Sequence, residues 1–245
     1  MLSKKQAGYV RSLHLKKFRQ MYGKFIVEGE KLVRELLHTE LTVDTVFSTV
    51  QLPEIKHLTE LVEVTPAELA KIATQQQPDK MLAVVSIPPA AAPGLLQDDL
   101  YLALDEINDP GNAGTIIRIA DWFGIKQIFL SPNTVDIYNP KTVAAAKGSL
   151  FRVPCSYVNL PQLMKANPSL PVLGTFMQGE NIYRTPLPQK GIIIIGNEAN
   201  GISAEVEALV TQKLTIPSFG KAESLNAGVA TGIVLSEFKR QALTK

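Results

Sequence analysis

The chain has 245 residues, of which 45% are hydrophobic and 20% are charged, and its formal net charge is +2. This composition is typical of a folded protein with one large core or two moderate ones, and it excludes an intrinsically disordered chain. No apolar run approaches the ~20 residues that a membrane-spanning helix needs. The N-terminus also lacks the apolar core of a signal peptide, so we expect a cytoplasmic protein.

The first 24 residues form a basic segment without any acidic side chain. Its basic residues are Lys4, Lys5, Arg11, Lys16, Lys17, Arg19 and Lys24. Because an all-positive segment repels itself unless an anionic partner gathers it, we expect nucleic acid to bind here rather than an idle solvated face. Aromatic residues are interleaved with the cations, which also suits base stacking. For Tyr9, Phe18 and Tyr22, however, we favour burial in the core.

Residues 25–86 predict a small α/β domain. A strand-like FIV at 25–27 precedes a helical pattern with four apolar residues on one side, and the short β-branched runs VDTVFST, VEVTP and MLAVVSI follow. Between residues 86 and 99, three prolines and an alanine run interrupt every periodicity, which indicates a linker. We therefore place the domain boundary near residue 93, with one domain at 1–93 and a second at 94–245.

The second domain alternates apolar strand-like runs with helical patterns. The strand-like runs are YLALDEI, QIFLS, VPCSYV, VLGTFM, GIIIIGN and LTIPS. Strands that are apolar throughout and separated by helices predict an α/β domain with a parallel sheet covered on both faces. Ligands of such sheets bind at the carboxyl ends of the strands, so the loops that follow strands are the candidate site.

The first of these loops is NDPGNAGTIIR, residues 108–118. Its glycines are three residues apart, so neither GxGxxG nor a P-loop is present, which argues against a nucleotide-dependent kinase or dehydrogenase. Asn112 is placed to cap the following helix. Arg118 lies within an isoleucine-rich stretch, where a guanidinium needs a ligand or else reaches a surface salt bridge; the spacing favours neither.

Two further loops follow buried strands. In IIIIGNEANGIS, residues 192–203, the carboxylate of Glu198 stands at the end of the strand, where a substrate-facing group or a helix cap would lie. In TIPSFGKAESLNAG, residues 215–228, Ser224 and Asn226 precede a helix and are either caps or site residues. Three polar loops at one sheet edge make a site more probable than any one of them.

The three loops together resemble the motifs of the SpoU family of RNA 2′-O-ribose methyltransferases. The matching segments are NDPGNAGTIIRIADWFG, IIIIGNEANGIS and IPSFGKAESLNAGVATGIVL, in this order along the chain. The segment VRSLHLKKFRQMYGKFIVEGEKLVREL is similar to the substrate-binding domain that many members carry, which itself resembles a ribosomal protein fold.

This resemblance implies a C-terminal domain with a trefoil knot, a homodimer formed through that domain, and S-adenosyl-L-methionine as cofactor. By motif position it implies the catalytic residues Asn112, Arg118, Glu198, Ser224 and Asn226. It places the cofactor against the backbone of the knotted loops, at Thr175, Gly196, Ile216 and Leu225. The RNA would be held by Lys4, Lys5, Arg11, Lys16, Lys17 and Arg19.

The reaction implied is methyl transfer to a ribose 2′-hydroxyl of structured RNA, most of all large-subunit ribosomal RNA. A transfer RNA substrate is the alternative, and a non-catalytic RNA-binding adaptor is a further one. We expect no metal, because His14, His38 and His57 lack ligand spacing. Cys155 stands alone in an apolar, β-like stretch, which favours a buried structural thiol over a catalytic one.

Overall fold

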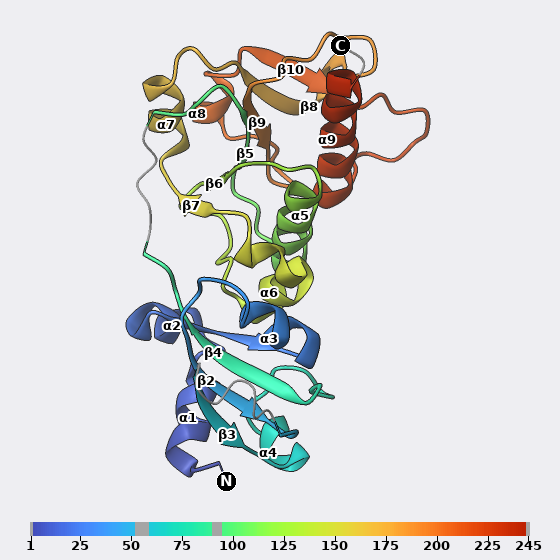
Figure 1. Ribbon diagram of the computed structural model, residues 1–245. Coiled ribbons are helices and arrows are strands. Elements are labelled where there is room, and N and C mark those ends of the chain that lie inside the picture. Colours follow the sequence, from blue (N-terminus) through green and yellow to red (C-terminus); the bar gives the residue numbers. More distant parts are fainter. Residues whose placement is uncertain (1, 52–58, 90–94, 244–245) are drawn as a thin grey trace. The chain divides into compact units, whose positions relative to one another are not determined.

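The computed structural model describes residues 2–51, 59–89 and 95–243, and Figure 1 shows their helices and strands. The chain divides into two compact units. The first contains Met1–Pro89 together with Asp136–Phe151, and the second contains Ala90–Val135 with Arg152–Lys245. The centre of the predicted linker, residues 90–94, lies outside the described residues, and a division of labour between 1–93 and 94–245 stays a prediction.

The first unit is a four-stranded sheet with helices on both faces. Its elements before residue 90 are α1 (Lys4–Ser12), α2 (Lys16–Tyr22), β1 (Lys24–Glu28), α3 (Glu30–Leu36), β2 (Val43–Ser48), β3 (Glu60–Glu63), α4 (Pro66–Ala70) and β4 (Met81–Ser86). The strand order is β1-β4-β2-β3, with β4 antiparallel to β1 and β2, and β3 parallel to β2. This is the small α/β domain that the sequence predicts.

The first unit has two hydrophobic cores, one on each face of its sheet, because successive side chains of the strands alternate between the faces. Phe25 and Val27 of β1 pack with Val33 of α3, while Ile26 between them packs on the other side with Val10 and other residues of α1 and α4. Successive side chains of a strand point to opposite faces, so both faces of this sheet are buried. Short helices are capped locally: Ser3 with Gln6 at α1, and Thr65 with Glu68 at α4, each form a capping box.

The segment Asp136–Phe151 belongs to the first unit although it lies far along the chain. It contains α6 (Pro140–Ala146) and the 3-10 helix η2 (Lys147–Phe151). Val143 joins the core around β1, and the Tyr138 ring lies 4.7 Å from that of Phe25. The helix expected from PKTVAAAKGSL is therefore present, but it completes the core of the first unit instead of covering the second sheet.

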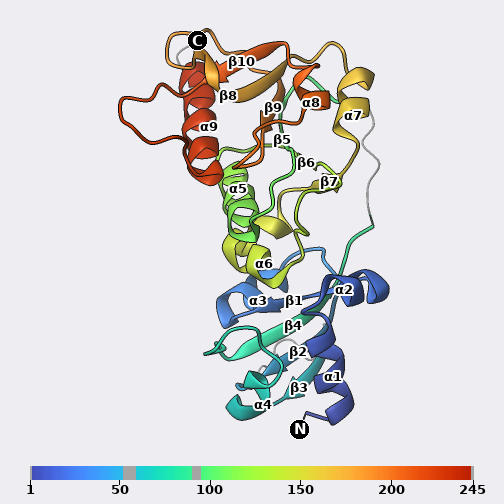
Figure 2. The ribbon, with the colours of Figure 1, turned by 180° about the vertical axis from the view of Figure 1, so that it is seen from behind.

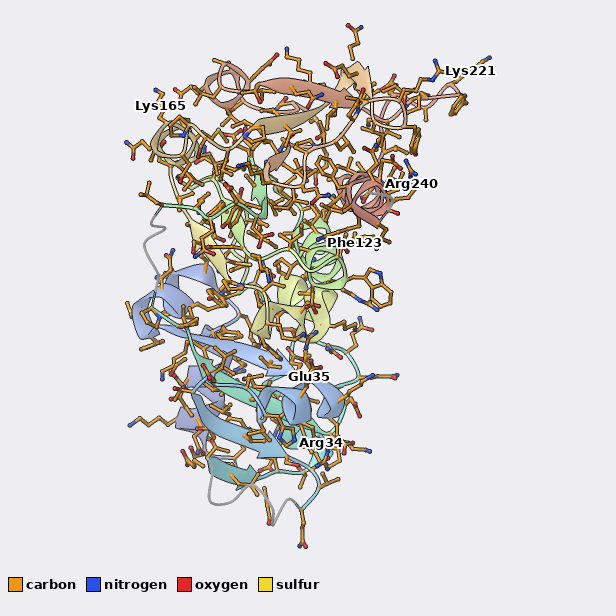
Figure 3. All side chains as sticks on the ribbon, turned by 45° about the horizontal axis from the view of Figure 1, so that its top comes forward. Arg34, Glu35, Phe123, Lys165, Lys221 and Arg240 are labelled. Atoms are coloured by element: carbon orange, nitrogen blue, oxygen red, sulfur yellow. The ribbon has the colours of Figure 1, made fainter. Side chains whose placement is uncertain are left out.

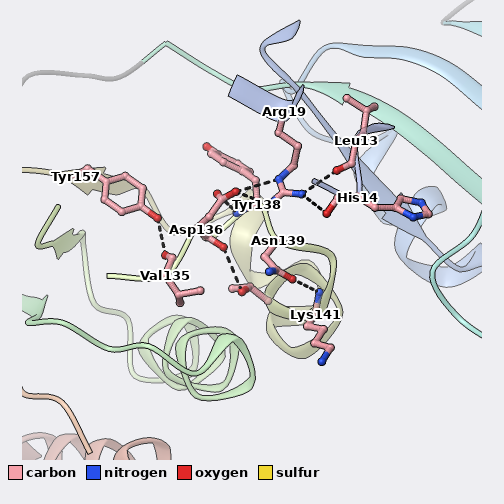
Figure 4. Close-up of polar contacts among 10 residues, drawn as sticks. Leu13, His14, Arg19, Val135, Asp136, Tyr138, Asn139, Lys141 and Tyr157 are labelled. Atoms are coloured by element: carbon pink, nitrogen blue, oxygen red, sulfur yellow. Dashed lines mark hydrogen bonds and ion pairs between the residues drawn. The ribbon is translucent and has the colours of Figure 1, made fainter. Parts of the chain in front are cut away.

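A buried ion pair fixes this segment within the first unit, as Figure 4 shows. The Arg19 side chain is 2% exposed, and its Nη2 and Nε lie 2.6 and 2.9 Å from Asp136 Oδ2. Its Nη1 donates to the carbonyl oxygens of Leu13 and His14 at 2.8 and 2.9 Å. The expectation that Arg19 binds RNA is therefore wrong for this structure, because every nitrogen of its guanidinium already has a partner.

The second unit is a six-stranded parallel sheet, as the sequence predicts. Its elements are β5 (Leu100–Leu104), α5 (Pro110–Trp122), β6 (Ile128–Leu130), β7 (Cys155–Tyr157), α7 (Leu160–Ala166), β8 (Val172–Asn181), β9 (Gly191–Ile195), α8 (Ala204–Glu207), β10 (Gln212–Thr215) and α9 (Ala227–Leu243). The strand order is β10-β8-β9-β5-β6-β7, and all five pairs are parallel. Strands β5 and β9 are buried throughout, which explains their continuous apolar runs.

Helices cover both faces of this second sheet. Helices α7 and α8 pack on one core through Leu160, Leu163 and Val206, while α5 and α9 lie side by side away from them (Figures 1 and 2). The close approach of α9 to α5 requires a small residue: a Cβ added at Gly228 would lie 2.9 Å from Thr115 Cγ2. No helix within the described ranges is long and apolar enough to cross a membrane.

Candidate active site

Three of the predicted catalytic residues meet at the carboxyl edge of the second sheet. Asn112 Nδ2 donates to Glu198 Oε1 at 2.6 Å, and Asn226 Nδ2 donates to Asn112 Oδ1 at 2.7 Å. The three residues come from three separate loop regions, 86 and 114 positions apart in sequence. The structure therefore brings together one residue from each of the three loops that the sequence singles out.

The start of helix α9 fixes the direction of these hydrogen bonds. Asn226 Oδ1 accepts from the backbone N–H groups of Gly228 and Val229, at 2.9 and 3.3 Å, so its amide nitrogen must face Asn112. Asn112 then accepts through its oxygen and donates to Glu198. The chain of donors runs from the helix through both amides to one carboxylate oxygen of Glu198, whose side chain is otherwise exposed.

Asn112 does not cap helix α5, contrary to the sequence expectation. Asp109 is the N-cap, and its Oδ1 accepts from the backbone N–H of Asn112 at 2.7 Å. With the cap supplied by Asp109, the amide of Asn112 is free to join Asn226 and Glu198. The sequence carries this signal as Asp109 directly before Pro110, because proline is favoured at the first position of a helix.

The loop after β9 is held by residues that the sequence reasoning did not select. Asn197 donates to the Glu106 carbonyl oxygen at 2.7 Å and accepts from the N–H groups of Ala199 and Asn200. Asp105, only 2% exposed, accepts from the Ser203 N–H at 2.7 Å. These contacts fix the turn that presents Glu198. Asn197 and Asp105 are visible in sequence only as polar residues at the ends of apolar strands.

The backbone packs closely around two of the predicted cofactor residues, Thr175 within β8 and Gly196 directly after β9. Thr175 Oγ1 donates to the Ile194 carbonyl oxygen at 3.0 Å, and a Cβ added at Gly196 would lie 2.4 Å from the Gly201 carbonyl carbon. Lys213 pairs with Gly174 and Leu214 with Glu180, so residues 175–179 bulge out of the ladder with β10. Thr175 is therefore the first residue of the part of β8 that leaves the ladder with β10, and its hydrogen bond to Ile194 places it against the neighbouring strand two residues before Gly196.

The loop from Ile216 to Asn226 extends away from the sheet (Figures 1 and 2), and Lys221 lies near its outer end in Figure 3. Ile216 is half-buried at its start, whereas Ser224 and Leu225 are exposed and Ser224 has no hydrogen-bond partner within the described residues. Asn226 is thus the only one of these predicted loop residues that the structure joins to Asn112 and Glu198. The roles of Ser224, Ile216 and Leu225 stay predictions.

Arg118 is exposed on α5 and does not face Asn112. Six residues along an α-helix correspond to about 600°, so Arg118 projects from a different face, the one that carries Thr115 and Trp122. Within the part of the chain that the structure describes, its guanidinium has no hydrogen bond or ion pair. It is a free cation at the border of a groove.

This groove runs between α5 and α9 and has a volume of about 700 Å³. Trp122 is 85% exposed beside it, and Val229 is 52% exposed. Its lining is mostly apolar or small: Thr115, Ile119, Trp122, Phe123, Tyr183, Asn226, Gly228, Val229, Gly232, Ile233, Ser236 and Glu237. A large exposed apolar groove of this kind marks an interaction surface.

The predicted RNA-binding cations of the first unit, apart from Arg19, are exposed: Lys4, Lys5, Arg11, Lys16 and Lys17. Among the aromatic residues between them, Tyr9 packs against the core of the first unit, as the sequence expectation has it, and Phe18 is half-buried. Tyr22 is 44% exposed, contrary to that expectation, because α2 ends at Tyr22, where Gly23 turns the chain into β1 with φ of +61°. The Tyr9 and Tyr22 rings lie 5.2 Å apart edge to face, and the Phe18 ring stacks near that of Tyr22 at 6.2 Å.

Cys155 is a half-buried free cysteine of β7. Burial raises the pKa of its thiol to about 12, and its Sγ donates to the Val153 carbonyl oxygen at 3.4 Å. A thiol with so high a pKa carries almost no thiolate at neutral pH. Among the described residues, no cluster of three or more histidine, cysteine, aspartate or glutamate side chains could hold a metal ion.

Two models of known protein families match this chain. Residues 99–236 match the model of the SpoU rRNA methylase family, and residues 5–83 match that of an MRM3-like substrate-binding domain. The chain belongs to the SpoU rRNA methylase family. The first match contains all three loops, and the second contains most of the first unit.

Full-length relatives support this membership of the SpoU family. The 23S rRNA (guanosine(2553)-2′-O)-methyltransferase RlmP of Bacillus subtilis is 31% identical over 232 residues, which cover 92% of each chain. The SpoU methyltransferase AviRb of Streptomyces viridochromogenes, solved with its cofactor AdoMet, has a TM-score of 0.89 at 25% identity and 99% coverage of both chains. An AdoMet-bound rRNA methyltransferase of Sinorhizobium meliloti has a TM-score of 0.88 at 28% identity, covering 98% of this chain and 96% of that one.

Proposed function

We propose that this chain transfers the methyl group of S-adenosyl-L-methionine to a ribose 2′-hydroxyl of structured RNA, and that the RNA is large-subunit ribosomal RNA. The observation that carries the proposal is the hydrogen-bonded set Asn112, Glu198 and Asn226 at the carboxyl edge of a parallel sheet. The similarity to RlmP, whose name specifies 2′-O-methylation of 23S rRNA, favours ribosomal RNA over transfer RNA.

The residues at this edge fit S-adenosyl-L-methionine. An adenosine needs apolar contacts for its base and backbone groups for its edges. The loops after β9 and β10 offer both, through the half-buried Ile216, the exposed Leu225, and a backbone that approaches closely at Gly196. When bound, the cofactor supplies a sulfonium-activated methyl group that departs from a neutral thioether. We further propose that these loops form the trefoil knot implied by the SpoU family.

Glu198 and the two asparagines position the acceptor nucleotide in this proposal. One Glu198 oxygen is already held by Asn112, so the second oxygen accepts a hydrogen bond from the ribose. Because the two amides already fix the Glu198 carboxylate, it loses little conformational entropy when the ribose binds. Ser224, in the loop before Asn226, closes over the site and anchors that loop by hydrogen bonding.

Arg118 contacts a phosphate of the acceptor nucleotide. A guanidinium stays protonated at any physiological pH, which makes it a poor proton acceptor and a good bidentate partner for phosphate. Holding that phosphate fixes the 2′-oxygen in line with the methyl group. Because Arg118 faces away from Asn112 and borders the α5–α9 groove, we propose that it serves the site of a second protomer docked in that groove.

The groove between α5 and α9 is the proposed homodimer surface. Val229 lies in its lining and is 52% exposed, so a charged side chain there meets solvent in a monomer and an apolar partner in a dimer. Val229→Glu is expected to convert a dimer into a monomer in sedimentation velocity, because burial of an unpaired carboxylate is costly. Met21→Glu, at a position of the first unit that is 66% exposed, is the control that keeps the dimer. A wild-type chain that sediments as a monomer at all concentrations contradicts this surface.

Mapping of 2′-O-methyl groups tests the whole proposal. RNA from cells without the gene is incubated with purified protein and radiolabelled S-adenosyl-L-methionine, and alkali-resistant positions are then read along each RNA. We expect one position in large-subunit ribosomal RNA to be missing in the cells and restored by the protein. If the protein restores a methyl group in transfer RNA alone, transfer RNA is the substrate and ribosomal RNA is not. If calorimetry shows cofactor binding but no RNA is methylated, the chain is a non-catalytic RNA-binding adaptor.

A further inference from the structure

The cluster of Tyr9, Phe18 and Tyr22 on the first unit has the features of a stacking surface. Its rings come from two neighbouring helices, α1 and α2, and touch edge to face and face to face. Phe18 and Tyr22 are separated by one helical turn, with their planes only 13° apart. Tyr22 ends the row at the last residue of α2 and is 44% exposed. Two near-parallel rings, of which the second is partly exposed and is braced edge to face by Tyr9, suit a further flat ring.

Charge around the cluster favours an anionic strand. The Lys17 ammonium lies 4.9 Å from the centre of the Phe18 ring, and Lys16 beside it is exposed. The Asp44 carboxylate acts on Tyr9, and its Oδ1 is 2.7 Å from Lys24 Nζ, which offsets its charge. An apolar protein segment gains nothing from so many cations, whereas the phosphates of a nucleic acid strand neutralise them.

Free hydroxyl groups add polar contacts to the stacking surface. Within the described residues, neither the Tyr9 nor the Tyr22 hydroxyl has a hydrogen-bond partner. Burial, the Asp44 carboxylate and Tyr22 together raise the pKa of Tyr9 above its ordinary value, so its phenol stays a hydrogen-bond donor at neutral pH. A base edge or a ribose hydroxyl offers acceptors to such donors.

We propose that Tyr22, supported by Phe18 and Tyr9, stacks on one unpaired base of the RNA, while Lys16 and Lys17 hold the adjacent phosphates. This proposal rests on the proposed function, since it names the RNA feature that the first unit selects. A base within a duplex is already stacked on both sides and is not available to a protein ring. The chain therefore prefers RNA with a loop or bulge to a continuous duplex.

The test is RNA binding by the full chain, which needs no methyl transfer. The probe is a short RNA hairpin whose loop holds one 2-aminopurine, a base that loses fluorescence when it stacks; a continuous duplex of equal length is the comparison. We expect the wild-type chain to bind the hairpin more tightly than the duplex and to quench the loop base. Tyr22→Ala should weaken hairpin binding by about 5- to 150-fold and leave duplex binding unchanged.

Matched variants separate stacking from other uses of this surface. Tyr22→Phe keeps the ring and should keep the quenching, whereas Tyr22→Leu keeps bulk without a π face and should lose it. Met21→Ala removes the neighbouring exposed apolar side chain and should bind as the wild type does. Lys17→Ala should reduce the slope of log affinity against log salt by roughly 0.7, the value for one phosphate contact with a single strand.

Several results would overturn the proposal. Tyr22→Ala and wild type with equal hairpin affinity and equal quenching would remove the stacking role and leave the methyltransferase assignment intact. Equal losses of hairpin affinity with Tyr22→Leu and Met21→Ala would show that apolar bulk, and not the π face of Tyr22, contacts the RNA. A wild-type chain that binds no RNA would overturn both this proposal and the proposed function, while circular dichroism of each variant checks that it is folded.

Discussion

Arg118→Ala is expected to lower the rate of methyl transfer to the preferred RNA about 100-fold. Arg118 is a free, exposed cation that we assign to the acceptor phosphate, and a misplacement of about 1 Å at the reacting centre has this size of effect. The affinity for S-adenosyl-L-methionine, measured by calorimetry, should not change, because Arg118 lies on α5 and is not among the residues proposed to hold the cofactor. The measurement is a single-turnover rate at saturating RNA.

Two control variants make the Arg118 result specific. Lys126→Ala removes another exposed cation, just beyond the end of α5, and should keep the wild-type rate. Arg118→Lys keeps the charge but loses the planar fork, so an intermediate rate is expected. If Arg118→Ala methylates the preferred RNA at the wild-type rate, the assignment to the acceptor nucleotide is wrong.

Mixed dimers show whether Arg118 serves its own site or that of the partner. Arg118→Ala and Glu198→Gln should each have a strongly reduced rate alone. In a heterodimer of the two, one site regains both residues if Arg118 reaches across the interface, and no site does so if it acts within its own protomer. Recovery of activity on mixing therefore supports the arrangement across the groove, and a rate that stays reduced contradicts it.

The three loops of the site could be predicted because their signals are local. Each follows an apolar strand, and the carboxyl ends of parallel strands share one edge of the sheet, so Asn112, Glu198 and Asn226 had to lie near one another. The hydrogen bonds among them were not predictable in the same way. They depend on Asp109 taking the cap of α5 and on Asn226 capping α9, and either asparagine could have filled a cap by itself.

The errors of the sequence reading concern contacts between distant parts of the chain. Arg19 and Asp136 are 117 positions apart, and nothing near either residue indicates the other. The expectation for Tyr22 was wrong for a related reason, since helical spacing groups Phe18 with Tyr22 but does not say whether another element covers them. Periodicity reports which residues share a face, and the partner of that face is decided by the tertiary fold.

The place of the segment Asp136–Phe151 also affects how the two units can be studied. Val143 and Tyr138 belong to the core of the first unit, so a chain without residues 1–93 would leave both side chains without their packing partners. Such a truncation would lose RNA binding and stability together. Point substitutions of Lys16, Lys17 and Tyr22 in the full chain separate the two effects, because these side chains are exposed.

Arg19→Met is expected to destabilise the first unit by about 3–5 kcal/mol, the cost of leaving one member of a buried ion pair without its partner. The substitution removes four hydrogen bonds at once: two to Asp136 Oδ2 and one each to the carbonyl oxygens of Leu13 and His14. Asp136 is only 13% exposed, so water cannot replace the guanidinium well. At about 2–4 °C per kcal/mol for a chain of this size, the melting temperature should fall by roughly 6–20 °C.

Two comparisons isolate the ion pair as the cause. Lys190→Met breaks the pair of Lys190 with Asp98, whose side chains are 43% and 71% exposed, and should shift the melting temperature by less than about 4 °C. Arg19→Met combined with Asp136→Leu removes both charges, so it should recover part of the loss from Arg19→Met alone. If the double variant is as unstable as the sum of its single variants, the pair is not coupled. A coupled pair means that α2 and the segment Asp136–Phe151, which are far apart in sequence, fold together as one part of the first unit.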